Sequence, residues 1–420
     1  MRPMPTILFI HKNFPTQFRY LAPYLARQGW GVYALSQEGS VERHHLTPLE
    51  NGVRIMGFAK TSSQAEVQQG YLTPMNEAVD AAVRVAAAAR KLRALGVMPD
   101  LIVAHSGWGN GSFAKSVWPA AKFVAYVEWW YRPGFDDAPE DPPAVAARKI
   151  QERARLNCRN LPSLLDVAQA DAIWTPTIYQ LEGLPPLLEG RVAQRYDGVD
   201  CAHYRPNPRR GPVNLPRARL APDTPILTYA TRGMEPVRGF PEFMAALSRV
   251  QALRPEVHCI IAGLNEVFYD NWLPNGESYL QRALSEHSFD ESRLHLVGKL
   301  DAERYRALLA RSDAHVYLTR PFVISWSLTE AMACAAPLIV SDTPPVREFL
   351  PDDAQAKYID HTDIGALTSA IIETLDDPSA ARARGNRARE RALEFDTAVL
   401  LPAHETWLLN VLSGRPTFGG

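Results

Sequence analysis

The feature that most constrains the fold of this chain is the alternation of short apolar runs with longer helical patterns. The apolar runs lack the strict apolar–polar alternation of a half-exposed strand, and helix-length segments separate them. Buried parallel strands connected by helices have this pattern. In the first half, the expected strands are residues 6–10, 31–35, 53–58, 101–104 and 122–127, and the expected helices are 17–27, 75–95 and 111–119.

The second half of the chain repeats this rhythm. Two doubly wound α/β sheets in series are the simplest interpretation, and 420 residues are enough for two such domains. The expected strands are 226–230, 257–262, 294–297, 314–318, 337–340 and 356–359, and the expected helices are 240–253, 302–311, 327–335 and 364–375, followed by 380–392 and 397–412.

A proline-rich stretch marks the boundary between the halves. Residues 204–225 read YRPNPRRGPVNLPRARLAPDTP, with six prolines and no apolar periodicity. Because proline removes a backbone donor and fixes φ, we expect no sheet or helix here and place the linker near residues 202–224. The predicted domains are residues 1–203 and 204–395, and a C-terminal helix and tail, residues 396–420, is expected to pack back on the first domain.

Composition and charge exclude several partners and locations. Lys plus Arg number 45 against 46 for Asp plus Glu, so no global field draws the protein to nucleic acid, and an anionic ligand must meet local basic residues. The four cysteines form no C-x-x-C pair, which predicts free thiols and neither a zinc site nor a disulfide framework. The apolar core of the N-terminus, residues 7–10, is too short for a signal peptide, and no run of about 18 apolar residues occurs. We expect a cytoplasmic protein, with peripheral attachment to the inner face of a membrane left open.

Ligands of open α/β sheets bind beyond the carboxyl ends of the strands, so the loops after the strands carry the functional hypotheses. The loop after residues 6–10 reads HKNFPTQ and is not G-x-G-x-x-G, which removes the main support for a dinucleotide dehydrogenase. The loop after residues 101–104 reads HSGWGNG, and its glycines beside His105 and Trp108 allow a ligand to approach the backbone closely. A plain turn with a solvated histidine is the alternative.

Two loops of the second half favour a nucleotide. The loop after residues 226–230 carries Arg232, Gly233 and Arg238 and lacks the P-loop pattern. Two guanidinium groups before a helix N-terminus suit a diphosphate, and a pair of solvated arginines is the alternative. Glu330, near the start of the helix 327–335, is placed to accept hydrogen bonds from the vicinal hydroxyls of a ribose. The alternative is a first-turn carboxylate that complements the helix dipole.

Four strings, taken in order, carry a family resemblance: TRGMEPVRGF, IIAG, HLVGKL and LTEAMACAAPLIVSDTPPVREF. This order resembles the donor half of glycosyltransferase family 4, which has the GT-B fold of two Rossmann-like domains that face each other across a cleft. In the first half, FIHKNFPTQFRYLAPYLARQGW and DLIVAHSGWG are similar to the acceptor domain of a bacterial subgroup with HxNFPxQF and HxGWG strings. The resemblance implies sugar transfer from a nucleotide-diphosphate donor with retention of configuration, without a cofactor or an obligatory metal.

The resemblance also implies a role for single residues. Arg232 and Arg238 match the two cations on the donor diphosphate, with Gly233 between them. Glu330 matches the carboxylate on the ribose, and His105 matches the histidine that touches the donor sugar. We expect His105, Arg232 and Arg238 to be catalytic. The other expected donor-binding residues are Leu300 beside the base, Ser325 and Ser327, and the expected acceptor-side residues are Phe14, Gln17, Trp108 and Glu128.

Two departures from the family pattern bear on the donor sugar. Phe322 stands eight residues before Glu330, where the family has a first Glu near the sugar hydroxyls. Ser325 or Ser327 is expected to replace part of its role. Phe14-Pro15-Thr16 replaces the paired glycines of the first loop.

The sequence therefore predicts a metal-independent, retaining hexosyltransferase for a glycan or glycolipid acceptor, in cell-surface polysaccharide or glycoconjugate biosynthesis. The adjacent carboxylates Asp136 and Asp137 lie in the acceptor half, where a solvated loop is expected rather than a metal site. Two alternatives stay open: a GT-B-like epimerase or phosphorylase, and a non-catalytic module that binds sugar nucleotides or glycans. The missing first Glu supports the second alternative.

Overall fold

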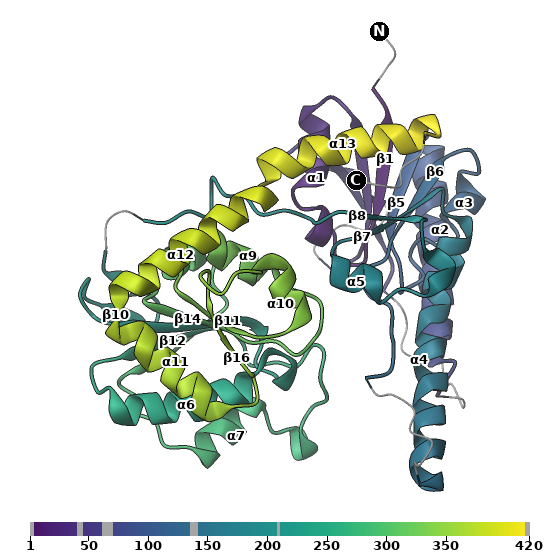
Figure 1. Ribbon diagram of the computed structural model, residues 1–420. Helices are drawn as coiled ribbons and strands as arrows, with labels where there is room; N and C mark the ends of the chain where they lie inside the picture. The colour runs from purple at the N-terminus through teal and green to yellow at the C-terminus, as the bar shows by residue number, and fades with distance from the viewer. Residues whose placement is uncertain (1–3, 40–44, 61–69, 135–141, 208–210, 416–420) are drawn as a thin grey trace. The chain divides into compact units, whose positions relative to one another are not determined.

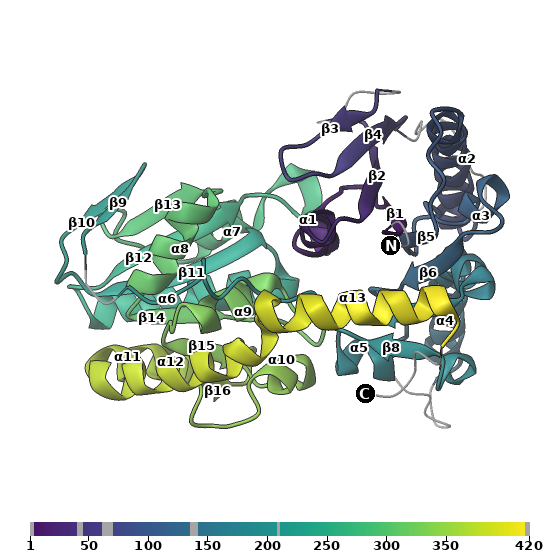
Figure 2. The same cartoon turned by 90° about the horizontal axis from the view of Figure 1, so that it is seen from above.

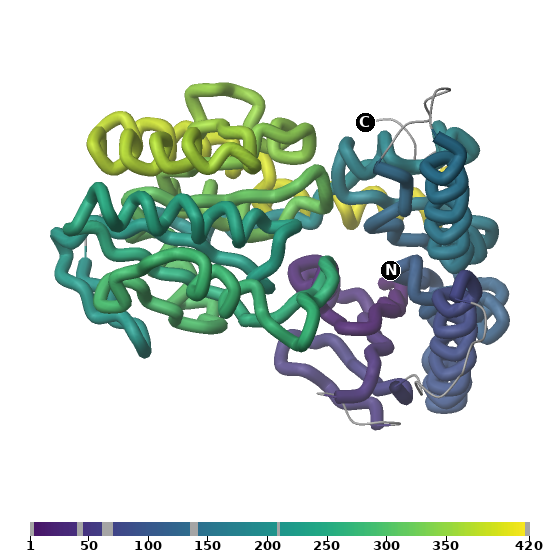
Figure 3. Tube along the Cα trace, turned by 90° about the horizontal axis from the view of Figure 1, so that it is seen from below, coloured from purple at the N-terminus to yellow at the C-terminus, as the bar shows by residue number. Residues whose placement is uncertain are grey.

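The computed structural model describes residues 4–39, 45–60, 70–134, 142–207 and 211–415. The chain divides into two compact units: the N-terminal unit, Met1–Asp197 with Leu400–Gly420, and the C-terminal unit, Gly198–Val399. The chain thus enters the C-terminal unit after Asp197 and returns to the first unit at Leu400 (Figure 3). In the described ranges, no helix combines the length and the apolar character that a membrane span needs.

An eight-stranded sheet in the order β3-β4-β2-β1-β5-β6-β7-β8 forms the centre of the N-terminal unit. Its strands run parallel except β3, which pairs antiparallel with β4. Because β1 lies between β2 and β5, the strand order reverses there, and the loops after β1 and β5 meet at this switch point. The strands are β1 (Thr6–Ile10), β2 (Gly31–Gln37), β3 (Thr47–Pro48), β4 (Arg54–Phe58), β5 (Leu101–His105), β6 (Lys122–Tyr126), β7 (Ala172–Thr175) and β8 (Val192–Gln194), and the helices are α1 (Leu21–Arg27), α2 (Thr73–Ala94), α3 (Ala114–Val117), α4 (Pro143–Gln169), α5 (Ile178–Glu182) and α13 (Thr397–Ser413).

Helices cover both faces of this sheet (Figure 2). α1 and α13 pack on one face, and α2, α3 and the end of α4 pack on the other. Glu405 of α13 accepts hydrogen bonds from the indole N–H of Trp30 (2.9 Å) and the hydroxyl of Tyr24 (3.0 Å). These bonds fasten the last helix to the N-terminal unit.

The C-terminal unit has the same doubly wound organisation. Its six parallel strands follow the order β13-β12-β11-β14-β15-β16, with a separate β9–β10 hairpin. The strands are β9 (Val213–Leu215), β10 (Ala218–Leu220), β11 (Ile226–Gly233), β12 (His258–Leu264), β13 (Leu294–Gly298), β14 (Ala314–Tyr317), β15 (Leu338–Ser341) and β16 (Lys357–Ile359), and the helices are α6 (Phe240–Leu253), α7 (Tyr279–Glu286), α8 (Ala302–Arg311), α9 (Trp326–Ala333), α10 (Pro344–Phe349), α11 (Ile364–Asp376) and α12 (Pro378–Ala392). Figure 1 shows α9 and α12 on one side of this sheet and α6, α7 and α11 on the other.

The predicted α/β class is confirmed, and every expected strand overlaps an observed one. Two expected helices are shorter than predicted. The helix expected at 17–27 begins only at Leu21, because Pro23 lacks the N–H for an intrahelical bond and is tolerated only in a first turn. The helix expected at 111–119 ends at Val117, since the residue before Pro119 is disfavoured in helical conformation.

The prediction that the proline-rich stretch contains no sheet is wrong. Residues 213–220 form the β9–β10 hairpin, in which Leu215 pairs with Ala218 and Val213 with Leu220. Pro216 lies in the turn of this hairpin, outside the ladder, where a missing N–H costs nothing. The 27-residue helix α4 was not predicted at all.

Candidate functional site

The loop between β11 and α6 is held in one conformation by its glycines. Gly239, at φ 63°, precedes α6, and a Cβ there would lie 2.6 Å from the Cβ of Leu318. A Cβ on Gly233 would lie 2.6 Å from the backbone oxygen of Glu266. Only glycine lets this loop pack so closely against the ends of the neighbouring strands.

Glu235 connects this loop to the segment after β12. Its side chain is fully buried, and Oε2 accepts hydrogen bonds from the backbone N–H groups of Phe268 (3.0 Å), Tyr269 (2.8 Å) and Asp270 (3.0 Å). In return, Oδ2 of Asp270 accepts from the backbone N–H of Val237 at 2.5 Å. The two loops therefore hold each other in place through carboxylate–backbone bonds.

The two arginines of the loop have different surroundings. Arg232 is exposed, and its guanidinium lies 4.1 Å from the ring centroid of Phe268. Arg238 is 8% exposed and donates to Oγ1 of Thr319 (3.0 Å) and the backbone oxygen of Val323 (3.1 Å). Arg232 is thus the cation open to solvent, and Arg238 is a buried cation fixed by its hydrogen bonds.

The loop between β14 and α9 carries the remaining donor-side candidates. The hydroxyl of Ser325 caps α9 by accepting from the backbone N–H of Ser327, and the Ser327 hydroxyl donates to it at 2.9 Å. Glu330 lies in α9 and is 5% exposed. Leu300, after β13, is half-buried and packs on an apolar cluster that includes Val297.

The loops after β1, β5 and β6 bring a polar cluster together in the N-terminal unit. His105 Nε2 donates to Oε2 of Glu128 at 3.0 Å, and Gln17 Nε2 donates to Oε1 of the same carboxylate at 2.7 Å. The His105 ring is 3% exposed, with Trp108 stacked on it at 4.2 Å and His11 edge-on at 4.8 Å. The carboxylate of Glu128 is 25% exposed and is the open end of this cluster.

Burial and neighbouring charges set the ionisation of the groups around His105. Burial lowers the pKa of His11 well below its usual value, and the charge of His105 acts in the same direction. Nδ1 of His11 accepts from the backbone N–H of Asn13 at 2.8 Å, which favours the neutral ring. Burial raises the pKa of Asp166 to about 7, although the hydroxyls of Ser112 and Ser106 act in the opposite direction.

The structure brings most predicted acceptor-side residues together. Gln17, Glu128 and Trp108 lie around His105, whereas Phe14 is 9% exposed and packs in the core beside Phe9. Thr16 has φ 29°, in the region that favours glycine, within the loop where the family has paired glycines.

Three residues around this loop have no role in the sequence analysis. Glu235 is one of them, although a carboxylate between two arginines is a usable signal. Phe268 and Tyr269 gave no signal at all. Asp136 and Asp137 lie outside the described residues. In the described part of the chain, no group of three or more His, Cys, Asp or Glu side chains is arranged to hold a metal ion, and the four cysteines are free thiols.

Two family models match the chain in succession. Residues 28–204 match the model described as "Glycosyl transferase family 4 group", and residues 214–391 match "Glycosyl transferases group 1". Each half of the chain thus matches a glycosyltransferase model, of family 4 in the first half and of group 1 in the second, and the fold is GT-B. The two matched ranges together include β5, β6, the β11–α6 loop and α9.

Curated relatives match over part of their length. The glycogen synthase of Mycobacterium tuberculosis is 29% identical over 204 residues, which cover 48% of this chain and 44% of that enzyme. The phosphatidyl-myo-inositol mannosyltransferase of Propionibacterium freudenreichii is 27% identical over 42% of each chain. The MMP alpha-(1->4)-mannosyltransferase of Mycolicibacterium hassiacum is 26% identical over 64% of this chain and 57% of its own. The matches thus span about half the length of these relatives.

Solved structures share the whole fold. A sucrose-phosphate synthase from Thermosynechococcus elongatus aligns with a TM-score of 0.72 and 16% identity, over 98% of this chain and 100% of its own. A glycosyltransferase from Rickettsia africae aligns with a TM-score of 0.65 and 15% identity, over 97% of this chain and 99% of its own. At these identities the likeness concerns the fold.

Proposed function

We propose that the protein is a retaining glycosyltransferase that moves a sugar from a nucleotide-diphosphate donor to a glycan or glycolipid acceptor. The observation that carries the proposal is the end of β11 and the loop before α6, where an exposed Arg232 and a fixed Arg238 precede the helix and Glu235 fastens the loop to the segment after β12. The family models and the synthase and mannosyltransferase relatives support the same activity. Because the HxNFPxQF and HxGWG strings resemble those of a bacterial subgroup, we further propose a role in the synthesis of surface polysaccharides or glycoconjugates, in the cytoplasm and at the inner face of the membrane when the acceptor is a glycolipid.

In the proposed reaction, the bond between the anomeric carbon and the diphosphate oxygen breaks, and the leaving diphosphate takes the electron pair. Arg232, Arg238 and the N-terminus of α6 stabilise this developing charge. Glu330 holds the ribose, and Leu300 lies beside the base. The acceptor hydroxyl forms the new bond on the same face of the sugar, and its proton passes to an oxygen of the departing diphosphate.

The N-terminal unit supplies the acceptor side. Glu128 has an exposed carboxylate whose two oxygens already accept from His105 and Gln17. A carboxylate oxygen has a further lone pair, so Glu128 can also accept a hydrogen bond from an acceptor hydroxyl. His105 then acts on the sugar side and keeps Glu128 in position.

The test of the donor site is the variant Arg232→Ala. Loss of a charged hydrogen bond should weaken nucleoside-diphosphate binding by roughly 1.5–3 kcal/mol, measured by calorimetry. The control is Arg282→Ala, because Arg282 is an exposed arginine of the same unit that pairs with Glu277. An affinity within twofold of wild type for Arg232→Ala would remove Arg232 from the site. Absence of any nucleoside-diphosphate binding by the wild type would contradict the proposed function itself.

The proposed chemistry does not depend on a divalent ion. Because arginines and backbone N–H groups meet the leaving charge, we expect sugar transfer to continue in excess EDTA. The measurement is the initial rate of donor consumption with and without chelator. Loss of activity that Mg²⁺ or Mn²⁺ restores would overturn this mechanism.

A further inference from the structure

A cavity of about 550 Å³ lies in the N-terminal unit, beside the His105 cluster. It is formed by the loops after β1 and β5, the first turns of α2 and one face of α4. Trp108 lines the cavity and also stacks on His105, so one indole ring separates the cavity from the His105–Glu128 pair. Its volume is that of a site for a small molecule or a terminal sugar unit.

Positive charge dominates the wall of this cavity. Lys12, Arg155 and Arg159 line it, against the single carboxylate of Glu77. Arg155 is neutralised by a bidentate pair with Glu152, at 2.8 and 2.6 Å. Lys12 has no ion-pair partner among the described residues, and Arg159 contacts an aromatic ring rather than a carboxylate. The wall therefore keeps an excess of cations.

Arg159 is held in position before any ligand arrives. Its guanidinium lies 3.9 Å from the ring centroid of Tyr131, and Nη2 donates to the Tyr131 hydroxyl at 3.0 Å. The backbone of Tyr131 is in turn fixed by the buried Asn160, whose amide accepts from its N–H and donates to its carbonyl, both at 2.8 Å. A guanidinium fixed in this way loses little entropy when it binds an oxyanion.

An unpartnered donor stands in the same wall. Asn110 lines the cavity and is 1% exposed, and its Nδ2 has no hydrogen-bond partner in the described structure. A buried amide donor without a hydrogen-bond partner destabilises the folded protein, so we expect a ligand to supply an acceptor atom to Nδ2 of Asn110. The neighbouring Gly109, at φ 75°, packs directly on α2, where a Cβ would lie 2.0 Å from the backbone oxygen of Ala78. The loop that carries Asn110 is thus fixed against α2.

The N-terminus of α2 adds to the positive potential. Thr73 and Pro74, its first residues, line the cavity, and no side chain caps this helix end. The 22-residue helix therefore directs free N–H groups and the positive end of its dipole to the region of Lys12 and Arg159. Trp108 and Tyr131 add flat apolar surface of the kind that sugar rings pack against.

We propose that this cavity binds the acceptor and that the acceptor carries an oxyanion, a phosphate or a carboxylate, on its polyol unit. Lys12, Arg159 and the α2 N-terminus bind the oxyanion, Asn110 donates to it or to a ring hydroxyl, and Trp108 directs a free hydroxyl toward Glu128. The inference rests on the proposed glycosyltransferase function and names the class of its acceptor.

The experiment measures binding of D-glucose 6-phosphate, D-glucuronate and D-glucose to the full chain by calorimetry at low and high salt. At least one of the two anionic probes should bind tenfold more tightly than glucose, and salt should weaken its binding. Lys12→Gln and Arg159→Gln should each reduce that affinity at least tenfold. The control variant Arg90→Gln removes an exposed cation of α2 outside the cavity and should change nothing. The preferred anion distinguishes a phosphate from a carboxylate acceptor.

The outcomes separate this inference from the proposed function. Equal binding of glucose and both anions, binding of neither anion, or anion binding that Lys12→Gln leaves unchanged would overturn the anionic acceptor. Lys12→Gln changes an exposed side chain that has no ion-pair partner among the described residues, so we expect it to leave folding intact, whereas Arg159→Gln also breaks the contact with Tyr131. Nucleoside-diphosphate binding is measured on the same variants and should be unaffected. If the nucleoside diphosphate binds but neither anionic probe does, the proposed function is retained and only the anionic acceptor is contradicted.

Discussion

The cluster around His105 shows how neighbouring side chains set the role of one imidazole. The ring is covered by Trp108 and bonded through Nε2 to Glu128, and Nδ1 has no partner in the described structure. Its proton donor is therefore committed to the carboxylate. Because the ring is 3% exposed and Nδ1 is buried, His105 acts on the reaction by orienting Glu128, and this role depends on the one hydrogen bond.

The variant His105→Ala should lower the rate of sugar transfer while leaving nucleoside-diphosphate affinity nearly unchanged. Arg232 and Glu330, which we propose bind the nucleotide, belong to the C-terminal unit, whereas His105 belongs to the other. The loss of one catalytic hydrogen bond costs about 2–4 kcal/mol of transition-state stabilisation. Steady-state kinetics together with calorimetry measure both quantities. A wild-type kcat/KM for donor and acceptor would show that His105 has no role in the reaction. Loss of nucleotide binding would show that the nucleotide binds the N-terminal unit and not the C-terminal unit.

At the residue scale, the sequence identified charged groups but not their surroundings. Arg232 lies at the end of β11 and Arg238 lies just before α6, yet one is exposed and the other is bonded to Thr319 and Val323. The two side chains differ in exposure because the hydrogen-bond partners of Arg238 lie in the loop after β14, more than 80 residues further along the chain. No pattern in the local sequence encodes these contacts. Glu235 was missed for the same reason, because its three partners come from the segment after β12.

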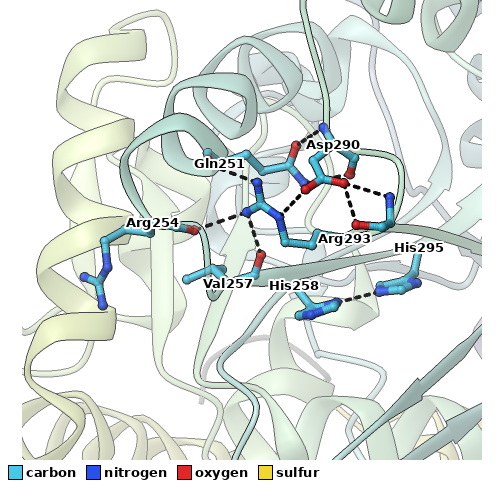
Figure 4. A network of polar contacts seen from close by, with 8 residues as sticks. Gln251, Arg254, Val257, His258, Asp290, Arg293 and His295 are labelled. Carbon is cyan, nitrogen blue, oxygen red and sulfur yellow. Dashed lines mark hydrogen bonds and ion pairs between the residues drawn. The ribbon is translucent and has the colours of Figure 1, made fainter.

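At the scale of elements, the side chain of Arg293 caps the C-terminus of α6 in the C-terminal unit (Figure 4). Arg293 donates to the backbone oxygens of Gln251 (3.2 Å), Arg254 (3.2 Å) and Val257 (3.4 Å), and Nε pairs with Asp290 at 2.7 Å. The carbonyls at the end of a helix lack intrahelical partners, so this guanidinium replaces several missing N–H groups.

We expect Arg293→Ala to destabilise the C-terminal unit by roughly 2–3 kcal/mol, because it leaves several carbonyls near a partly buried position without donors. Arg254→Ala is the matched control, since Arg254 only pairs with the exposed Glu256 and Asp376 and should cost less than about 1 kcal/mol. Urea unfolding measures both. Equal free energies of unfolding for the two variants would contradict the helix-capping role of Arg293.

Elements with strong apolar cores were predictable, and those stabilised by contacts distant in sequence were not. The run 226–230 is buried on both faces and was predicted as a strand, now β11. The β9–β10 hairpin lacks such a run and is stabilised by packing of Val213 and Leu220 on the edge of the sheet. The proline content of this stretch led to the prediction that it contains no strand, but neither β9 nor β10 contains a proline.

At the scale of the whole molecule, both units bury neutral histidines. Burial lowers the pKa of His315 in the C-terminal unit to about 4 and that of His404 in the α13 helix to about 4. His315 is fully buried and bonds through Nδ1 to the Thr228 hydroxyl at 2.7 Å. In the same unit as His315, Nδ1 of His258 and Nε2 of His295 lie 2.9 Å apart, and the pKa of each histidine is lowered, first by burial (Figure 4).

These shifts give the two units different responses to acid. A histidine with a folded pKa of about 4 stays neutral in the native state, while its unfolded form takes up a proton below about pH 6.5, so stability falls as the pH is lowered from 7 to 4. Asp166 in the N-terminal unit has the opposite sign: its folded pKa of about 7 means that native protein holds a proton that unfolded protein has released, and stability rises as the pH falls through 7. In the N-terminal unit, Asp166 thus offsets part of the effect of His11 and His404, whose pKa values burial lowers. In the C-terminal unit, His315, His258 and His295 all act in one direction.

We therefore expect the C-terminal unit to lose more stability than the N-terminal unit between pH 7.5 and 5, by an amount on the order of 2 kcal/mol for His315 alone. Differential scanning calorimetry at the two pH values measures this, and the variant His315→Asn identifies the transition of the C-terminal unit. That variant should lower the stability of this transition at pH 7.5, because it disturbs a buried hydrogen bond, and at the same time reduce its dependence on pH. Asp166→Asn is the complementary variant and should make the N-terminal transition more sensitive to acid. A C-terminal transition that does not move with pH, or an N-terminal transition that falls further, would contradict the assignment of neutral buried histidines to these positions.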